Sequence, residues 1–132
     1  MADVVDTIVV RTSPREYVVR LTNVSDSTGE SAVIKVDIST LVGPGRYIAP
    51  TAVSLQEMQW CIRGFNSVRL FWDHTADDEI AVLSGDGYRS YRELGGLMDP
   101  RSAGGTGDVL LTTDGAAVGN TYDIVLCFRL KA

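Results

Sequence analysis

The C-terminal segment Thr121–Lys131 constrains the fold more than any other part of the chain. From Tyr122 onward the apolar residues fall on every second position: Tyr122, Ile124, Leu126, Phe128 and Leu130. A side-chain period of two is typical of a β-strand that turns one face to a hydrophobic core. The chain is therefore expected to close on a strand that is fixed inside a sheet.

Short β-rich segments recur along the rest of the chain, and Gly, Pro, Asp, Asn and Ser separate them. With the last strand included, the predicted strands are Val4–Arg11, Glu16–Val24, Ala32–Val36, Val53–Arg63, Ser67–Asp73, Ile80–Leu83, Tyr88–Glu93, Val109–Thr113 and Thr121–Lys131. About nine short strands with little or no helix are typical of an all-β fold. Since 132 residues suit one domain, we predict a single antiparallel β-sandwich over residues 1–132, jelly-roll-like, with 8–9 strands.

The predicted connections are short and rich in glycine. Gly64-Phe-Asn66 and Gly85-Asp-Gly87 are each predicted to be tight hairpin turns, and Gly115–Asn120 joins the last two strands into a closing hairpin. Within Val53–Arg63 the apolar residues change phase, which predicts either a β-bulge near Gln56-Glu57 or a break into two strands.

Three apolar residues fall on strand faces that are expected to be exposed to solvent. Phe71 lies between Leu70 and Trp72, which are expected to face the core. Val125 and Cys127 likewise lie between core-facing residues of the last strand. Such residues are covered by a loop, by another strand or by another subunit. They are our candidate contacts with another subunit or with a partner protein.

The N-terminus supplies two further candidate contacts, Val4 and Val5. Residues 1–6 mix polar and apolar side chains and are expected to form an extended arm that adds to the sheet edge of a neighbouring molecule.

Charge and composition disfavour several partners. The net charge of −5 disfavours nucleic acid, because an acidic surface repels phosphate groups. No segment approaches the roughly 18 apolar residues of a membrane helix, so no membrane partner is expected. No export signal is visible, so we expect a protein made in a cytoplasm, with Cys61 and Cys127 as reduced thiols in or near a core.

The polar clusters match no catalytic or metal-binding pattern, so we expect a protein that is not an enzyme and has no catalytic residue, bound metal or cofactor. The segment Asp73–Glu79 carries oxygen ligands for a hard cation, but its spacing fits a solvated turn better than a calcium loop. His74 is the sole histidine, without a nucleophile motif around it. A carboxylate pair for glycoside chemistry is left open, as is sugar stacking by Trp60, Tyr88 and Tyr91.

Three segments together resemble a family of small virion proteins of tailed bacteriophages, common in phages of marine bacteria and cyanobacteria. They are the segment 21–39, the strand Val-Arg-Leu-Phe-Trp-Asp at 68–73, and Gly-Gly-Thr-Gly-Asp-Val-Leu-Leu-Thr-Thr-Asp-Gly at 104–115, followed by 121–129. Arg46–Met58 and Tyr88–Met98 depart from the family pattern.

The resemblance implies a head decoration, or cement, protein. Such a protein binds the major capsid protein on the capsid exterior and stabilises the shell, usually as a homo-oligomer, with a trimer favoured. It would be made in the host cytoplasm and act in the virion, and no catalytic residue comes with this family. The alternatives are a tail or neck component of the virion and a carbohydrate-binding module that aids adsorption.

Overall fold

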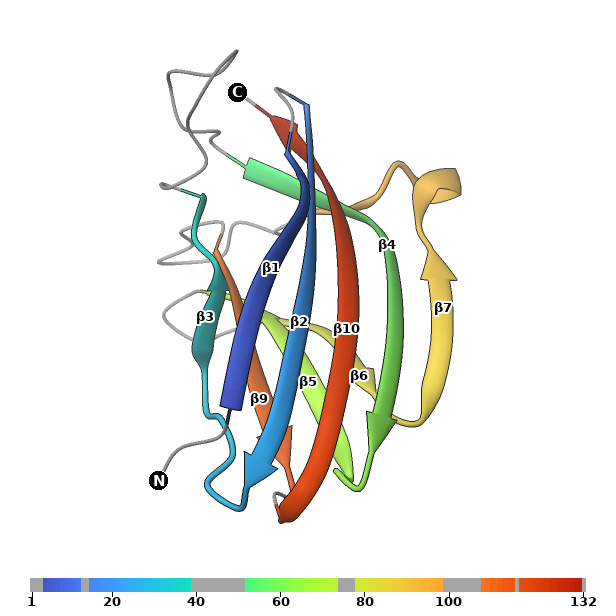
Figure 1. Cartoon of the computed structure of the whole chain (residues 1–132). Helices are drawn as coiled ribbons and strands as arrows, with labels where there is room; N and C mark the ends of the chain where they lie inside the picture. The colour runs from blue at the N-terminus through green and yellow to red at the C-terminus, as the bar shows by residue number, and fades with distance from the viewer. Residues whose placement is uncertain are drawn as a thin grey trace.

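The computed structural model describes residues 4–12, 15–38, 52–73, 78–98, 108–115 and 117–131. Within these ranges the chain is almost entirely β-strand, arranged as two antiparallel sheets packed face to face (Figure 1). The predicted all-β sandwich is therefore confirmed. A short 3₁₀ turn, η2 (Arg92–Leu94), lies outside the sheets.

The larger sheet, sheet A, has the strand order β1-β2-β10-β4-β7, and β8 also pairs with β4. Its strands are β1 (Val4–Thr12), β2 (Glu16–Asp26), β10 (Val118–Lys131), β4 (Ala52–Arg63), β7 (Asp86–Ser90) and β8 (Leu97–Met98). The 14-residue β10 lies at the centre between β2 and β4. The end of the chain is thus held inside a sheet, as its alternating pattern predicts.

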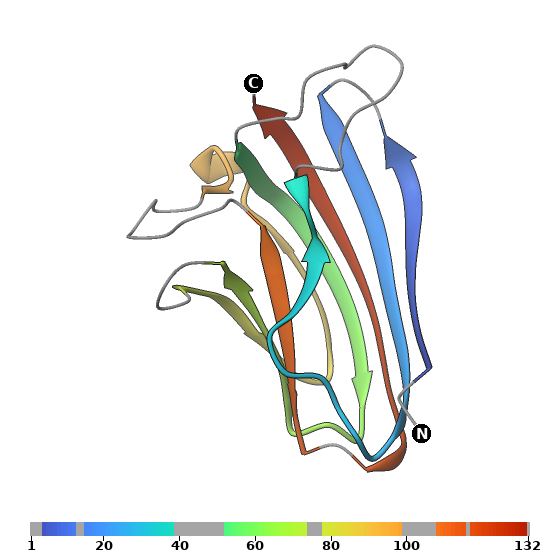
Figure 2. The same cartoon turned by 90° about the vertical axis from the view of Figure 1, so that its left-hand side faces the viewer.

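The smaller sheet, sheet B, has the order β3-β9-β5-β6. Its strands are β3 (Val33–Val36), β9 (Val109–Asp114), β5 (Ser67–Trp72) and β6 (Asp78–Leu83). Figure 2 shows sheet B to the left of the central strands of sheet A, with β3 in front and β1 farthest to the right.

The core lies between the two sheets and is built from the alternating residues of both. On β10 the buried residues are Tyr122, Ile124, Leu126, Phe128 and Leu130, the five that define the sequence pattern. Sheet B contributes Val68, Leu70 and Trp72 from β5. Burying one such side chain stabilises the fold by roughly 1.5–3 kcal/mol, so this interior supplies most of the driving force for folding.

The phase change in β4 is a β-bulge. Cys127 of β10 pairs with Glu57, whereas the next residue, Phe128, pairs with Leu55, so Gln56 is the extra residue. The bulge lets Leu55 and Met58 both face the core although they are three positions apart. Of the two sequence alternatives, the bulge is confirmed and β4 continues as one strand.

The three connections predicted as hairpins are instead crossovers between the sheets. Residues 64–66 join β4 of sheet A to β5 of sheet B, and residues 84–85 join β6 of sheet B to β7 of sheet A. The last two strands, β9 and β10, also belong to different sheets (Figure 2). Short glycine-rich connections fit hairpins and crossovers alike, so their chemistry did not reveal which strands pair.

These crossovers contact one another at one end of the sandwich. The backbone N–H of Asn66 donates to the carbonyl of Asp114 at 3.0 Å, and that of Ile62 donates to the carbonyl of Gly85 at 2.7 Å. The Asn120 side-chain amide donates to the carbonyl of Gly115 at 3.0 Å. The chain reversals are therefore fastened together by their own hydrogen bonds.

A buried ion pair anchors the connection from β2 to β3. The carboxylate of Glu30 lies 2.5 Å from Nζ of Lys35, and both side chains are almost fully buried. The same carboxylate accepts hydrogen bonds from the Tyr122 hydroxyl at 2.5 Å and from Asn23 Nδ2 at 2.8 Å. The connection thus joins the core of sheet A to the first strand of sheet B.

Candidate functional site

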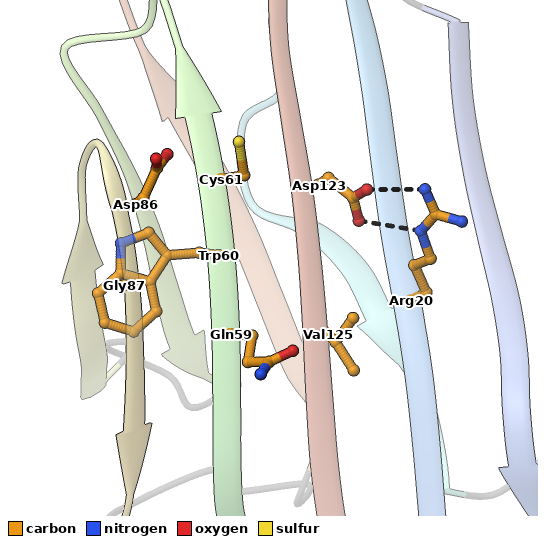
Figure 3. A pocket seen from close by; sticks show the side chains of 8 residues that line it. All are labelled: Arg20, Gln59, Trp60, Cys61, Asp86, Gly87, Asp123 and Val125. Carbon is orange, nitrogen blue, oxygen red and sulfur yellow. Dashed lines mark hydrogen bonds and ion pairs between the residues drawn. The ribbon is translucent and has the colours of Figure 1, made fainter.

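The outer face of sheet A carries two hollows and two arginine–carboxylate pairs. It is formed where β2, β10, β4 and β7 turn their non-core residues away from sheet B (Figure 3). Two neighbouring hollows of about 420 and 250 Å³ lie on it and share Gln59 and Val125. Their other lining residues are Arg20, Trp60, Cys61, Asp86, Gly87 and Asp123 in the first, and Val18, Glu57, Met58, Tyr88 and Cys127 in the second.

Two arginine–carboxylate pairs border the larger hollow. The guanidinium of Arg20 donates to both oxygens of Asp123 at 3.0 and 2.7 Å (Figure 3). The guanidinium of Arg63 donates to both oxygens of Asp86 at 2.5 and 2.9 Å. Two-pronged pairs of this kind hold their side chains in fixed orientations, so the rim of the hollow is rigid although it is exposed.

Cys61 lies between these pairs and faces solvent. Its thiol donates a hydrogen bond to the carboxylate of Asp86, and this contact raises the pKa of Cys61 above its ordinary value. The same carboxylate has a lowered pKa, chiefly because Arg63 donates hydrogen bonds to it. The hydrogen bond to Asp86 thus favours the protonated form of this exposed thiol.

Val125 and Cys127, both predicted contact residues, lie on this face. Val125 pairs across the sheet with Gln59 on one side and Arg20 on the other, at the boundary of the two hollows (Figure 3). Cys127 is half-buried, and desolvation raises the pKa of its thiol. Nη2 of Arg92 lies 3.6 Å from its sulfur, so a side chain of the same subunit covers part of it.

Both thiols are free, and their place in the fold corrects the sequence expectation of cysteines in or near the core. Cys61 lies opposite Asp123 on β10, whereas Cys127 lies opposite Glu57 on β4. Four residues of strand therefore separate them, roughly 13 Å at about 3.3 Å per residue. That is too far for a disulfide bond.

Phe71, the third apolar residue predicted on a wet face, lies on the opposite side of the molecule. It belongs to β5 and alternates with the buried Leu70 and Trp72, so it points out of sheet B. The guanidinium of Arg69 lies 5.4 Å from its ring centre. A cation–π contact of this type gives Phe71 local cover, and it does not share a face with Val125 and Cys127.

Val4 and Val5 lie in β1, at the free edge of sheet A. Their backbones pair with Val24 and Asn23 of β2 in the same subunit, and Val5 is 36% exposed. Residues 4–6 of the expected arm are thus paired within their own sheet, whereas residues 1–3 lie outside the described residues.

Sequence reasoning missed the most exposed apolar residues of this edge. Ile8, Val9 and Val10 are 43%, 50% and 57% exposed. Three consecutive apolar residues place apolar side chains on both faces of a strand. These three consecutive apolar residues can be read from the sequence. They mark a strand that exposes apolar side chains on both of its faces.

The three aromatic candidates for sugar stacking do not form one surface. Tyr88 is 55% exposed on β7 beside the smaller hollow. Trp60 and Tyr91 pack partly buried against the core, and the Trp60 indole donates to the carbonyl of Ser84 at 3.0 Å. Of this set, Tyr88 alone presents a broadly exposed ring.

The acidic segment predicted as a weak cation site falls mainly outside the described residues. His74 and Asp77 belong to the part of the chain whose structure is not described, and Asp73 and Glu79 lie on either side of it. Within the described ranges no group of three or more His, Cys, Asp or Glu side chains is placed to hold a metal ion. The described ranges also contain no helix long and apolar enough to cross a membrane.

Chemically, the outer face of sheet A offers rigid polar groups around a small apolar floor. Such a surface suits contact with a folded protein or with a sugar, since both present mixed polar and apolar groups. Comparison with known proteins adds no relative: no family model, no curated protein and no solved structure matches the chain.

Proposed function

We propose that this chain is a structural protein of a tailed-bacteriophage virion, and in particular a decoration protein on the outside of the head. The observation that carries the proposal is the free edge of sheet A, where the apolar residues of β1 stay exposed in the isolated subunit, as expected of a protein that works as part of an assembly. Contiguous exposed apolar residues usually mark an interaction surface. The resemblance of three segments to phage virion proteins supplies the biological setting.

Three physical features support this role. Three short crossovers at one end of the sandwich carry hydrogen bonds of their own, which suits a rigid clip on a shell. Its net charge of −5 would complement basic patches on a capsid exterior. Repetition of a modest interface over hundreds of sites strengthens attachment through avidity.

The connectivity supports the same assignment at the level of the fold. The order β2-β10-β4-β7 in one sheet faces the order β3-β9-β5-β6 in the other, and the chain repeatedly crosses between them. We infer a jelly-roll arrangement, an architecture that also occurs in viral capsid domains. On the proposed function the partner is the major capsid protein, and the protein is a homo-oligomer, for which the family resemblance implies a trimer.

Quantitative mass spectrometry and cryo-electron microscopy of the parent particle test this function together. We expect hundreds of copies per particle and density for this sandwich on the outer surface of the head. A few copies located in the tail or neck would favour the alternative virion role. Absence of the chain from purified particles would reject both.

Carbohydrate binding is the second candidate, and the exposed ring of Tyr88 beside a hollow favours it. Sugars stack on such rings while neighbouring amides and carboxylates bind their hydroxyl groups. A glycan array probed with and without calcium tests this role, with Tyr88→Ala as the matched variant. Absence of binding under both conditions would remove the candidate.

A further inference from the structure

The edge strand β1 has an unusual combination of length and exposure. It spans nine residues, pairs with β2 on one side and ends the strand order of sheet A. Every side chain from Val5 to Arg11 is exposed. Figure 2 shows why: β1 extends beyond the part of sheet A that sheet B covers.

An edge of this kind is normally protected against pairing with another strand. Here four of its residues are apolar and exposed, namely Val5, Ile8, Val9 and Val10. Val24 of the adjacent β2, 52% exposed, adds a fifth apolar residue beside them. Among the described residues no strand pairs with the outer side of β1, so the edge combines open backbone groups with apolar side chains on both of its faces.

A β-bulge sets the spacing of the two charged residues on this edge. Val9 pairs with Val19 and Arg11 pairs with Val18, so Val10 is an extra residue. Because of this insertion, Asp6, Ile8 and Arg11 lie opposite alternate residues of β2, namely Thr22, Arg20 and Val18. They consequently share the outer face of sheet A, with the acid and the base on either side of Ile8.

This arrangement is complementary to itself. If a second copy pairs with β1 in antiparallel fashion about a twofold axis at Ile8, the two Ile8 side chains come together. The bulge then brings Asp6 of each copy opposite Arg11 of the other. Opposite charges facing each other across paired strands stabilise the pairing, whereas like charges oppose it. The existing pair of Arg11 with Glu16, at 3.6 Å, is exposed and leaves the guanidinium accessible.

We propose that β1 is the interface between two copies of this chain, joined edge to edge into one continuous antiparallel sheet. The occupant of the edge is a second β1, in the register centred on Ile8. A twofold contact of this kind closes on itself, so this edge builds a dimer and does not build the trimer that the family resemblance implies. The inference concerns the purified protein and does not depend on binding to a capsid.

Analytical ultracentrifugation of charge-reversed variants tests the proposal. Asp6→Arg and Arg11→Asp should each weaken the dimer roughly tenfold, because each places two like charges opposite each other twice in the dimer. An equimolar mixture of the two variants should dimerise again, since both contacts in the mixed dimer are attractive. Glu79→Arg, a reversal of the same kind on the exposed edge strand β6 of sheet B, is the control and should leave association unchanged.

Disulfide trapping supplies a second measurement in case charge reversal impairs folding. With Cys61 and Cys127 replaced by serine, Ile8→Cys should form a covalent dimer on mild oxidation, whereas Val24→Cys should not. Thermal unfolding of each variant checks that it is folded. A wild-type protein that stays monomeric up to about 1 mM, sediments as a trimer, or yields variants whose mixture fails to associate would overturn the proposal.

Discussion

At the scale of single residues, Cys61 shows how neighbours control an exposed side chain. The thiol faces solvent, yet its hydrogen bond to Asp86 raises its pKa. Arg63, which is paired with that carboxylate, acts in the opposite direction and lowers the pKa of Cys61. Exposure and reactivity are therefore separate properties at this position, because only the thiolate is a good nucleophile.

Removal of the carboxylate should therefore increase the reactivity of Cys61. In a Cys127→Ser background, Asp86→Asn should speed alkylation by iodoacetamide near neutral pH, because Arg63 then favours the thiolate. The rate measured against pH should show a lower midpoint than in the parent protein. Asp123→Asn, which removes a weaker influence on the same thiol, should change the rate less. An unchanged rate for Asp86→Asn would contradict the proposed control of the thiol.

Lys35 gives a second prediction at this scale. Lys35→Met should lower the free energy of unfolding by about 3–5 kcal/mol, because it leaves the buried carboxylate of Glu30 without its cation. The double variant Lys35→Met with Glu30→Gln should recover part of that loss, since it removes the buried charge. Urea unfolding followed by tryptophan fluorescence measures both. Equal losses would show that the charge of Glu30 is unimportant.

At the scale of elements, most strands follow from the sequence, because alternation reports directly which side chains face the core. The parity slip in β4 located the bulge at Gln56 for the same reason. The segment predicted at Tyr88–Glu93 was placed too late in the chain: β7 spans Asp86–Ser90, and Arg92–Leu94 form a 3₁₀ turn. β8, with two residues, is too short to show any period.

The bulge in β4 predicts that Gln56 can be deleted at lower cost than a neighbouring residue of the strand. Deletion of Gln56 removes the extra residue, so Leu55 and Met58 stay on the core face, and it loses the bond to Ser54, for about 1 kcal/mol. Deletion of Gln59 shifts the register by one residue, so the core residues on one side of it must turn outward. For that variant we expect the free energy of unfolding to fall by more than about 4 kcal/mol, at about 1.5–3 kcal/mol for each exposed side chain. Comparable losses in urea unfolding would argue against the bulge.

The crossover between β4 and β5 depends on a close approach at Gly64. Its φ is +91°, and a Cβ there would lie 2.1 Å from Oδ1 of Asn120. Gly64→Ala should cost roughly 1–2 kcal/mol for the left-handed backbone and about 1 kcal/mol more if the bond from Asn120 to Gly115 breaks. Gly85→Ala is the control, because φ is +62° but no atom lies within 4 Å. Equal unfolding free energies would mean that Asn120 adapts freely.

At the scale of the whole molecule, the two sheets divide the predicted contact residues among separate surfaces. Phe71 faces out of sheet B, whereas Val125 and Cys127 face out of sheet A and Val5 lies at its edge. A subunit has therefore at least three distinct places for contact. A neighbouring copy and a capsid surface can be accommodated on different ones.

Removal of residues 1–6 should separate assembly from folding. The side chains of Val5 and Asp6 are exposed, so their loss removes little of the core, and the melting temperature should fall by no more than about 5 °C. The proposed dimer loses Asp6 and should weaken at least roughly tenfold. Calorimetry and ultracentrifugation on the same sample measure the two effects. Parallel losses would show that β1 mainly supports the core.

The sequence by itself determined the fold class, most strand positions, the place where β4 changes phase and the alternating core of β10, because each depends on side chains that are near in the chain. Only the tertiary structure decided that three glycine-rich connections cross between sheets, that Phe71 lies away from Val125 and Cys127, and that β1 is an exposed edge. Those properties depend on which strands become neighbours. Which strands pair depends on how much apolar surface the whole sandwich buries. A local sequence pattern carries no information about that total.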